Sequence, residues 1–192
     1  MVIATHKTDM ETADYANQHR ELVEGCLRRD RQAQFALYQQ YAKGMYNVCK
    51  RMLNNVHDAE DVLQVAFVDV FSRIDTFKFQ SSIGAWIKRI VVNRCIDHLK
   101  RRRLLTEELE VERHDYRVVE TTEEGYDPSM LSVDSVKKAL GGLSEGYRVV
   151  VSLYLFEGYD HEEIGEILGI SSSTSKSQYH RGKKRLRELL AA

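Results

Sequence analysis

The stretch that decides the fold is residues 159–170, YDHEEIGEILGI, near the C-terminus. Asp160 followed by Glu163 has the capping-box spacing that begins a helix. An apolar stripe at helical spacing follows, formed by Ile164, Ile167 and Leu168. Gly169 stands where a residue in the left-handed conformation would end that helix. The stretch therefore predicts a short helix closed by a tight turn.

A second, basic helix is predicted over residues 171–190, and either Ser171 or Ser172 can cap it. One face of this helix is apolar or small and consists of Tyr179, Gly182, Leu186 and Leu189. A separate polar face carries Lys176, Ser177, His180, Arg181 and Lys184. The pattern is typical of a helix-turn-helix whose second helix enters a DNA major groove. An ordinary helical hairpin with a solvated basic face also fits it.

Composition limits the class of protein. A chain of 192 residues suits one medium domain or two small ones, and a single proline with 30% charged residues favours helices. The three cysteines (Cys26, Cys49 and Cys95) form no CxxC pair and have no histidine spacing that completes a zinc site, so we expect reduced thiols. No apolar run reaches membrane-spanning length and no signal-peptide pattern is visible, which predicts a cytoplasmic protein. No metal or other cofactor is expected.

Charge is distributed in blocks along the chain. The net charge of −1 averages basic blocks at residues 88–103 and 176–187 with an acidic run at residues 107–127. Two basic patches joined by an acidic connector suit two contacts with one polyanion better than a single uniform surface does.

Helical periodicity also runs through the first half of the chain. Apolar residues at spacings of three and four predict helices that start near Gln18, Asp30 and Asp58, with residues 54–57 as a turn. The helix capped by Asp58 carries four polar residues on its outward face, Glu60, Asp61, Gln64 and Asp69. Paired carboxylates can serve acid–base or metal chemistry, but no histidine lies at ligand spacing. A solvated or partner-binding face is the better interpretation.

Residues 75–82 form a predicted loop that contains Phe77, Lys78 and Phe79. Such a loop can stack unpaired bases, because every base has a π-face and lysine attracts phosphate. Both rings can equally anchor the loop to the core, and the residues alone do not decide. A helix is predicted over residues 83–103, with a row formed by Trp86, Arg89, Asn93 and Asp97.

Residues 104–131 are acidic and weakly periodic, and they contain the only proline, so we expect a flexible linker. Helices are predicted over residues 132–140 and 143–156. The expected fold is all-α, with an N-terminal arm at 1–19, a helical domain at 20–103, the linker at 104–131 and a helix-turn-helix domain at 132–192.

In this order, the elements resemble the extracytoplasmic-function (ECF) group of bacterial RNA polymerase sigma factors, which contain the second and fourth conserved sigma regions joined by a linker. The resemblance covers residues 20–103 and 132–190. Residues 58–64, DAEDVLQ, are similar to the family's polymerase-binding motif. Residues 77–97 are similar to the segment that opens the strands and reads the minus-ten element, and residues 143–189 to the minus-thirty-five reader.

The resemblance implies a role for each face. The polymerase-binding residues would be Glu60, Asp61, Gln64 and Asp69. The minus-ten residues would be Phe77, Phe79, Ser82, Trp86, Lys88, Arg89 and Asn93. The minus-thirty-five residues would be Thr174, Lys176, Ser177, His180, Arg181 and Lys184. The implied partners are core RNA polymerase (the coiled coil of its largest subunit and its flap), promoter DNA and an anti-sigma factor, with no small-molecule substrate.

The start of the second helix departs from the family pattern. The family has Gly-Thr-Val where this chain has Ser173, Thr174 and Ser175. Ser175 removes an apolar packing residue, so we expect the start of this helix to be held less firmly.

Two other classes of protein explain less of the chain. A helix-turn-helix regulator that binds duplex DNA without polymerase accounts for residues 160–190 but leaves residues 58–64 and the aromatic loop without a role. A nucleic-acid hydrolase needs a metal or nucleophile cluster, and the seven histidines are scattered. The sequence therefore favours a promoter-specificity subunit with no enzymatic activity of its own.

Overall fold

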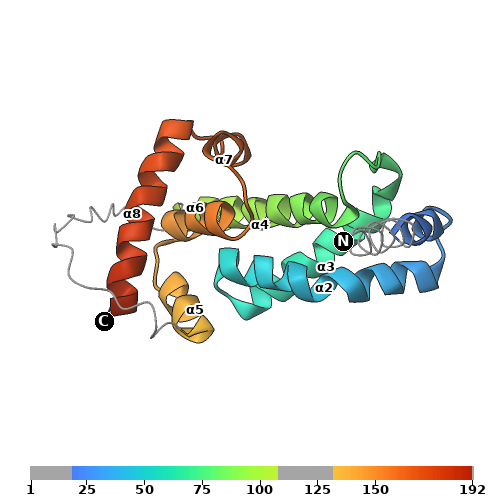
Figure 1. The fold of residues 1–192 in the computed structure, drawn as a ribbon, viewed down its shortest axis with the longest axis horizontal. Coiled ribbons are helices and arrows are strands. Elements are labelled where there is room, and N and C mark those ends of the chain that lie inside the picture. The colour runs from blue at the N-terminus through green and yellow to red at the C-terminus, as the bar shows by residue number, and fades with distance from the viewer. Residues whose placement is uncertain (1–18, 108–131, 192) are drawn as a thin grey trace, which may run out of the picture. The chain divides into compact units, whose positions relative to one another are not determined.

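The computed structural model describes residues 19–107 and 132–191, where the regular elements are all helical (Figure 1). A helix over residues 19–27 precedes the others. The helices that follow are α2 (Arg31–Leu53), α3 (Val56–Ser72), the 3₁₀ turn η1 (Ile74–Thr76), α4 (Ile83–Glu107), α5 (Val133–Gly141), α6 (Glu145–Leu155), α7 (His161–Leu168) and α8 (Ser172–Ala191). The expected all-α fold is confirmed. The expected arm and most of the expected linker lie outside the described residues.

Two helix boundaries differ from the sequence-based prediction. α3 begins at Val56, so Asp58 lies in its first turn and not at the N-cap position before it. The chain turns at Asn54, whose φ of 53° is a left-handed conformation that asparagine tolerates better than most residues do. α4 continues past Arg103 to Glu107, because arginine, leucine and glutamate are good helix formers and no glycine or proline interrupts the run.

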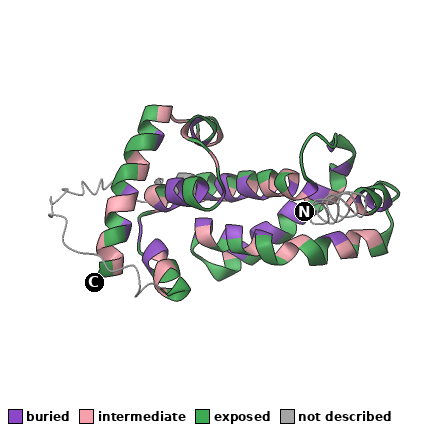
Figure 2. Cartoon of the chain, in the orientation of Figure 1, coloured by how far each residue is buried: buried purple, intermediate pink, exposed green. Residues whose placement is uncertain are grey.

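The chain divides into two compact units. The first comprises the described residues up to Cys49 together with His57–Arg94, and its core lies between α2, α3 and α4 (Figure 2). Tyr38 of α2 packs edge-on against Phe67 of α3, with ring centroids 4.8 Å apart. These contacts leave the outward face of α3 and the loop before α4 in solvent.

The three cysteines are buried free thiols, as expected for reduced residues. Burial and the nearby carboxylate of Asp30 raise the pKa of Cys26 to about 11. Cys26 therefore stays a neutral thiol at physiological pH and packs as a small apolar residue.

The second unit comprises Lys50–Val56 and the described part of Cys95–Ala192. In it, α8 packs against α5, α6 and α7. Its hydrophobic core is formed by Ala139, Leu140, Leu143, Val151 and Leu186, with Tyr179 and Leu189 packed against it. Gly182 lets α8 come close to α6, because a Cβ there would lie 2.8 Å from Cγ2 of Val151. The predicted apolar face of the second helix is therefore confirmed as its core-facing side.

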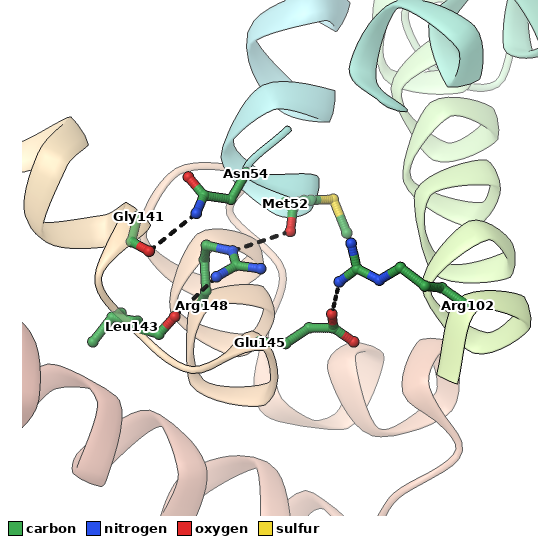
Figure 3. A network of polar contacts seen from close by, with 7 residues as sticks. All are labelled: Met52, Asn54, Arg102, Gly141, Leu143, Glu145 and Arg148. Atoms are coloured by element: carbon green, nitrogen blue, oxygen red, sulfur yellow. Dashed lines mark hydrogen bonds and ion pairs between the residues drawn. The ribbon is translucent and has the colours of Figure 1, made fainter. Parts of the chain in front are cut away.

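A buried guanidinium organises the turn between α5 and α6 in this unit (Figure 3). Arg148 is 6% exposed and donates hydrogen bonds from Nη1 to the Leu143 carbonyl at 2.8 Å and from Nε to the Met52 carbonyl at 3.3 Å. Beside it, the Asn54 amide donates to the Gly141 carbonyl at 3.0 Å. Burial lowers the pKa of Arg148, and Glu145 opposes that effect. The charge is tolerated because two backbone carbonyl oxygens accept hydrogen bonds from the guanidinium.

Candidate nucleic-acid interface

The first helix of the helix-turn-helix begins with the predicted capping box. Asp160 Oδ1 accepts hydrogen bonds from the backbone N–H groups of Glu162 and Glu163, both at 2.8 Å. Glu163 Oε2 accepts from the Asp160 N–H at 2.9 Å. Gly169 ends α7 with a φ of 71°, the left-handed conformation that the sequence indicated. Local chemistry therefore sets both ends of α7.

The start of α8 is capped by Ser171, whose Oγ accepts a hydrogen bond from the Thr174 N–H at 3.0 Å. This contact decides between the two serines that the sequence left open. The expected minus-thirty-five residues all reach the surface of α8: Thr174, Lys176, Ser177, His180 and Arg181 are exposed and Lys184 is half-buried. The Ser177 hydroxyl donates to the Ser173 carbonyl at 2.9 Å, so part of its hydrogen-bonding capacity is used inside the helix.

The turn between α7 and α8 requires a residue without a side chain at Gly165. A Cβ at Gly165 would lie 2.8 Å from the Ile170 carbonyl oxygen, which is backbone and cannot rotate away. We expect Gly165→Ala to destabilise the protein by about 1–3 kcal/mol in a thermal or denaturant unfolding measurement. Gly146→Ala is the matched control in α6, where nothing lies within 4 Å of the new Cβ. The control should stabilise by about 0.5–1 kcal/mol, and equal effects of the two changes would contradict the argument.

The two phenylalanines of the loop before α4 occupy different environments. Phe77 is buried and packs against Trp86, with ring centroids 5.6 Å apart. Phe79 is 42% exposed and has a φ of 57°, which is strained for a bulky residue. The Arg20 guanidinium lies over its ring, 4.9 Å from the centroid. Phe77 therefore anchors the loop to the core, while Phe79 is presented to solvent.

The remaining predicted minus-ten residues lie along the start of α4. Ser82 Oγ accepts a hydrogen bond from the Ala85 N–H at 3.2 Å and so caps this helix. Arg89 and Asn93 are exposed, and Lys88 and Trp86 are half-buried. Arg20, in the helix over residues 19–27, was not predicted as part of this site, because no local pattern connects it with a loop so far along the chain.

The outward face of α3 is partly polar and partly apolar. Glu60, Asp61 and Gln64 are exposed, as predicted. Asp69 differs, because it is half-buried and forms an ion pair with Arg94 of α4. Val65 and Val68 are exposed and share a helical stripe with Asp61 and Gln64. Neither valine was predicted as part of this face, although both lie off the core stripe of α3 in the sequence.

Within the described ranges, no three His, Cys, Asp or Glu side chains are placed to hold a metal ion. None of the helices in those ranges combines the length and the apolar character needed to cross a membrane.

Comparison with known proteins identifies the family. Residues 37–104 match the model of sigma-70 region 2, and residues 134–186 match that of sigma-70 region 4. The chain is 31% identical to the ECF RNA polymerase sigma factor SigW of Bacillus subtilis over 158 residues, which are 78% of this chain and 84% of that protein. It is 34% identical to the ECF sigma factor SigE of Mycolicibacterium smegmatis over 157 residues, but these span only 60% of that protein and 81% of this chain.

The fold agrees with two solved structures at lower sequence identity. One is the sigma factor RpoE in complex with the anti-sigma factor NepR from Bartonella quintana, with a TM-score of 0.56, 22% identity and coverage of 82% of this chain and 96% of that chain. The other is CnrH in complex with the cytosolic domain of CnrY, with a TM-score of 0.54, 22% identity and coverage of 90% and 97%.

The chain belongs to the ECF group of sigma-70-type sigma factors. It binds RNA polymerase and promoter DNA and directs promoter-specific initiation of transcription, and like other sigma factors it performs no chemistry itself. The family and function predicted from the sequence are thereby confirmed.

Proposed function

We propose that residues 20–103 bind core polymerase and open the minus-ten element, while residues 132–192 read the minus-thirty-five element. The observation that best supports the first assignment is the contrast between buried Phe77 and exposed, strained Phe79. A loop that served only to anchor itself to the core would bury both rings. Strain of this kind persists where the surroundings enforce it, and it is frequent at binding sites.

In this proposal Phe79 stacks on a base flipped out of the minus-ten element. Phe77 packs against the Phe79 ring, with centroids 4.8 Å apart, and is itself packed against Trp86. Lys88, Arg89 and Asn93, along the start of α4, hold the phosphate backbone and the edge of the duplex. Arg20 lies over the ring before DNA arrives, so an incoming base either displaces it or stacks beside it.

The second DNA contact in the proposal is the exposed face of α8. Lysine and arginine side chains there fix the register of the helix through phosphates, and His180 and Arg181 reach base edges in the major groove. Thr174 and Ser177 line the same face, close to the capped start of the helix.

Arg181→Ala is expected to weaken use of the minus-thirty-five element by about 5- to 150-fold, the equivalent of one lost base contact. The measurement is run-off transcription from paired promoters that differ only in that element. Arg187→Ala provides the matched control, because Arg187 is exposed on the same helix but lies about one turn beyond Lys184, the last of the proposed contacts. If the two substitutions have equal effects, the assignment of the face is wrong.

The outward face of α3 is proposed to bind the coiled coil of the polymerase's largest subunit. The helix-turn-helix unit is proposed to bind the flap of the polymerase. Val65 and Val68 add apolar area to the predicted contacts Glu60, Asp61 and Gln64. Asp69 would act indirectly, since its ion pair with Arg94 ties α3 to α4.

We also propose that an anti-sigma factor binds the free protein in the cytoplasm. The support is likeness of fold to a sigma factor solved with its anti-sigma factor. Co-purification of the tagged full-length chain from its native host, with and without added core polymerase, tests this. A bound protein that polymerase displaces would agree with the proposal. A chain that elutes only with polymerase, or only by itself, would contradict it.

The overall function has a direct test. The purified chain with core polymerase should start transcription at one specific promoter, and the chain alone should bind that promoter poorly. Tight and specific binding to the duplex without polymerase would instead favour an independent regulator.

A further inference from the structure

A buried hydrogen bond joins the two helices of the helix-turn-helix. Ser175 in the first turns of α8 is fully buried, and its Oγ lies 2.9 Å from Nδ1 of His161, the first residue of α7. From the sequence, Ser175 was expected to weaken the packing at this point. The structure instead places a directional polar contact there.

Aromatic rings from two other positions enclose this pair. The His161 ring stacks on Tyr154 of α6, with centroids 4.5 Å apart and an interplanar angle of 17°. Tyr179 of α8 meets the His161 ring edge-on at 5.6 Å and the Tyr154 ring at 4.4 Å. The cluster therefore connects α6, α7 and α8 around a single hydrogen bond.

The position of the pair relates it to DNA reading. Ser175 lies between Thr174 and Lys176, both on the proposed minus-thirty-five face. A hydrogen bond holds distance and angle within narrow limits, whereas an apolar contact tolerates sliding and rotation. A bond at Ser175 thus restricts how α8 rotates about its axis relative to α7, and with it where the exposed side chains of α8 point.

We propose that His161 and Ser175 are positioning residues, whose hydrogen bond sets the orientation of α8 and thereby the base preference at the minus-thirty-five element. This inference rests on the proposed minus-thirty-five face of α8. Neither residue touches DNA in the proposal; both act through the side chains of α8.

Threonine and valine have nearly the same shape, but only threonine carries a hydroxyl. Placed at position 175, they therefore separate the effect of the hydroxyl from the effect of side-chain volume. Ser175→Thr should keep the preference for the cognate element over a mutated one within about twofold, since it retains the hydroxyl. Ser175→Val should lower that preference by about tenfold, because it leaves the His161 nitrogen without its partner. Ser175→Ala, which adds no volume, should behave like the valine variant even if the larger side chains fit poorly.

The double variant His161→Phe with Ser175→Val distinguishes positioning from simple stability. Its apolar pair should restore the melting temperature that Ser175→Val alone loses, while the preference for the cognate element stays low. Recovery of both would mean that the bond is only structural and would overturn the inference.

The experiments distinguish an error in the positioning role of His161 and Ser175 from an error in the proposed minus-thirty-five face. If Arg181→Ala lowers minus-thirty-five use and neither Ser175→Val nor Ser175→Ala does, only the positioning role is wrong. If the native protein shows no dependence on the minus-thirty-five element at all, the proposed face and the inference fail together.

Discussion

Phe79→Gly should remove most promoter opening and leave the fold intact. The glycine eliminates the ring, and stacking of one base on an aromatic side chain contributes about 1–3 kcal/mol, or about 5- to 150-fold in open-complex formation. The φ of 57° at this position is strained for phenylalanine but free for glycine, which recovers about 1–2 kcal/mol. That gain offsets the lost contacts with Arg20 and Phe77, so the free energy of unfolding should change by no more than about 1 kcal/mol.

The readout for Phe79→Gly is transcription from a duplex promoter compared with a template melted in advance across the minus-ten element. The loss should be larger on the duplex, because stacking helps to stabilise the melted state. Phe79→Tyr keeps the ring and should retain most activity. Phe35→Ala removes another exposed phenylalanine of the same unit and should have little effect. Equal losses on the two templates would contradict the proposal that Phe79 captures a base.

The helix-turn-helix could be predicted in detail because its signals are local. Asp160, Glu163, Gly169 and Ser171 each act on backbone groups within a few residues. The first three occupy the predicted positions, and Ser171 is one of the two caps that the sequence allowed. The predicted start of α3 was wrong, and the cause is also local. Asn54 completes the turn in a left-handed conformation, so the helix begins at Val56, before the aspartate that looked like its cap.

The pairing of side chains between distant segments could not be predicted. Nothing in the sequence indicates that Asp69 pairs with Arg94, or that Phe77 is buried while Phe79 is exposed. Ser175 shows why such details matter. A serine in an apolar position looks like a defect in packing until the partner on α7 is known, and then it is a buried polar group with its hydrogen bond satisfied.

Asp61→Lys should weaken binding to core polymerase by at least about tenfold. The exposed carboxylates of this face suit a basic partner surface, and a lysine facing such a surface costs several kcal/mol. The fold should be unaffected, since Asp61 is exposed on the outward face of α3. Glu24→Lys makes the same charge reversal on an exposed residue outside the proposed face and serves as the control. Affinity for core polymerase is measured with a labelled chain, and helicity by circular dichroism. Unchanged affinity would contradict the role of Asp61.

Val68→Ala tests the apolar part of the same face. Val68 is 67% exposed, so its truncation should barely change stability in the free protein. If polymerase covers it, about two buried methyl groups are lost from the interface, and affinity should fall by about tenfold.

The salt dependence of binding separates the charged contribution of this face from its apolar contribution. The Asp61→Lys defect should shrink as salt screens the repulsion, whereas the Val68→Ala defect should persist, because burial of apolar surface does not depend on charge. A Val68→Ala defect that disappeared with salt would mean that polymerase contacts only the polar half of this face.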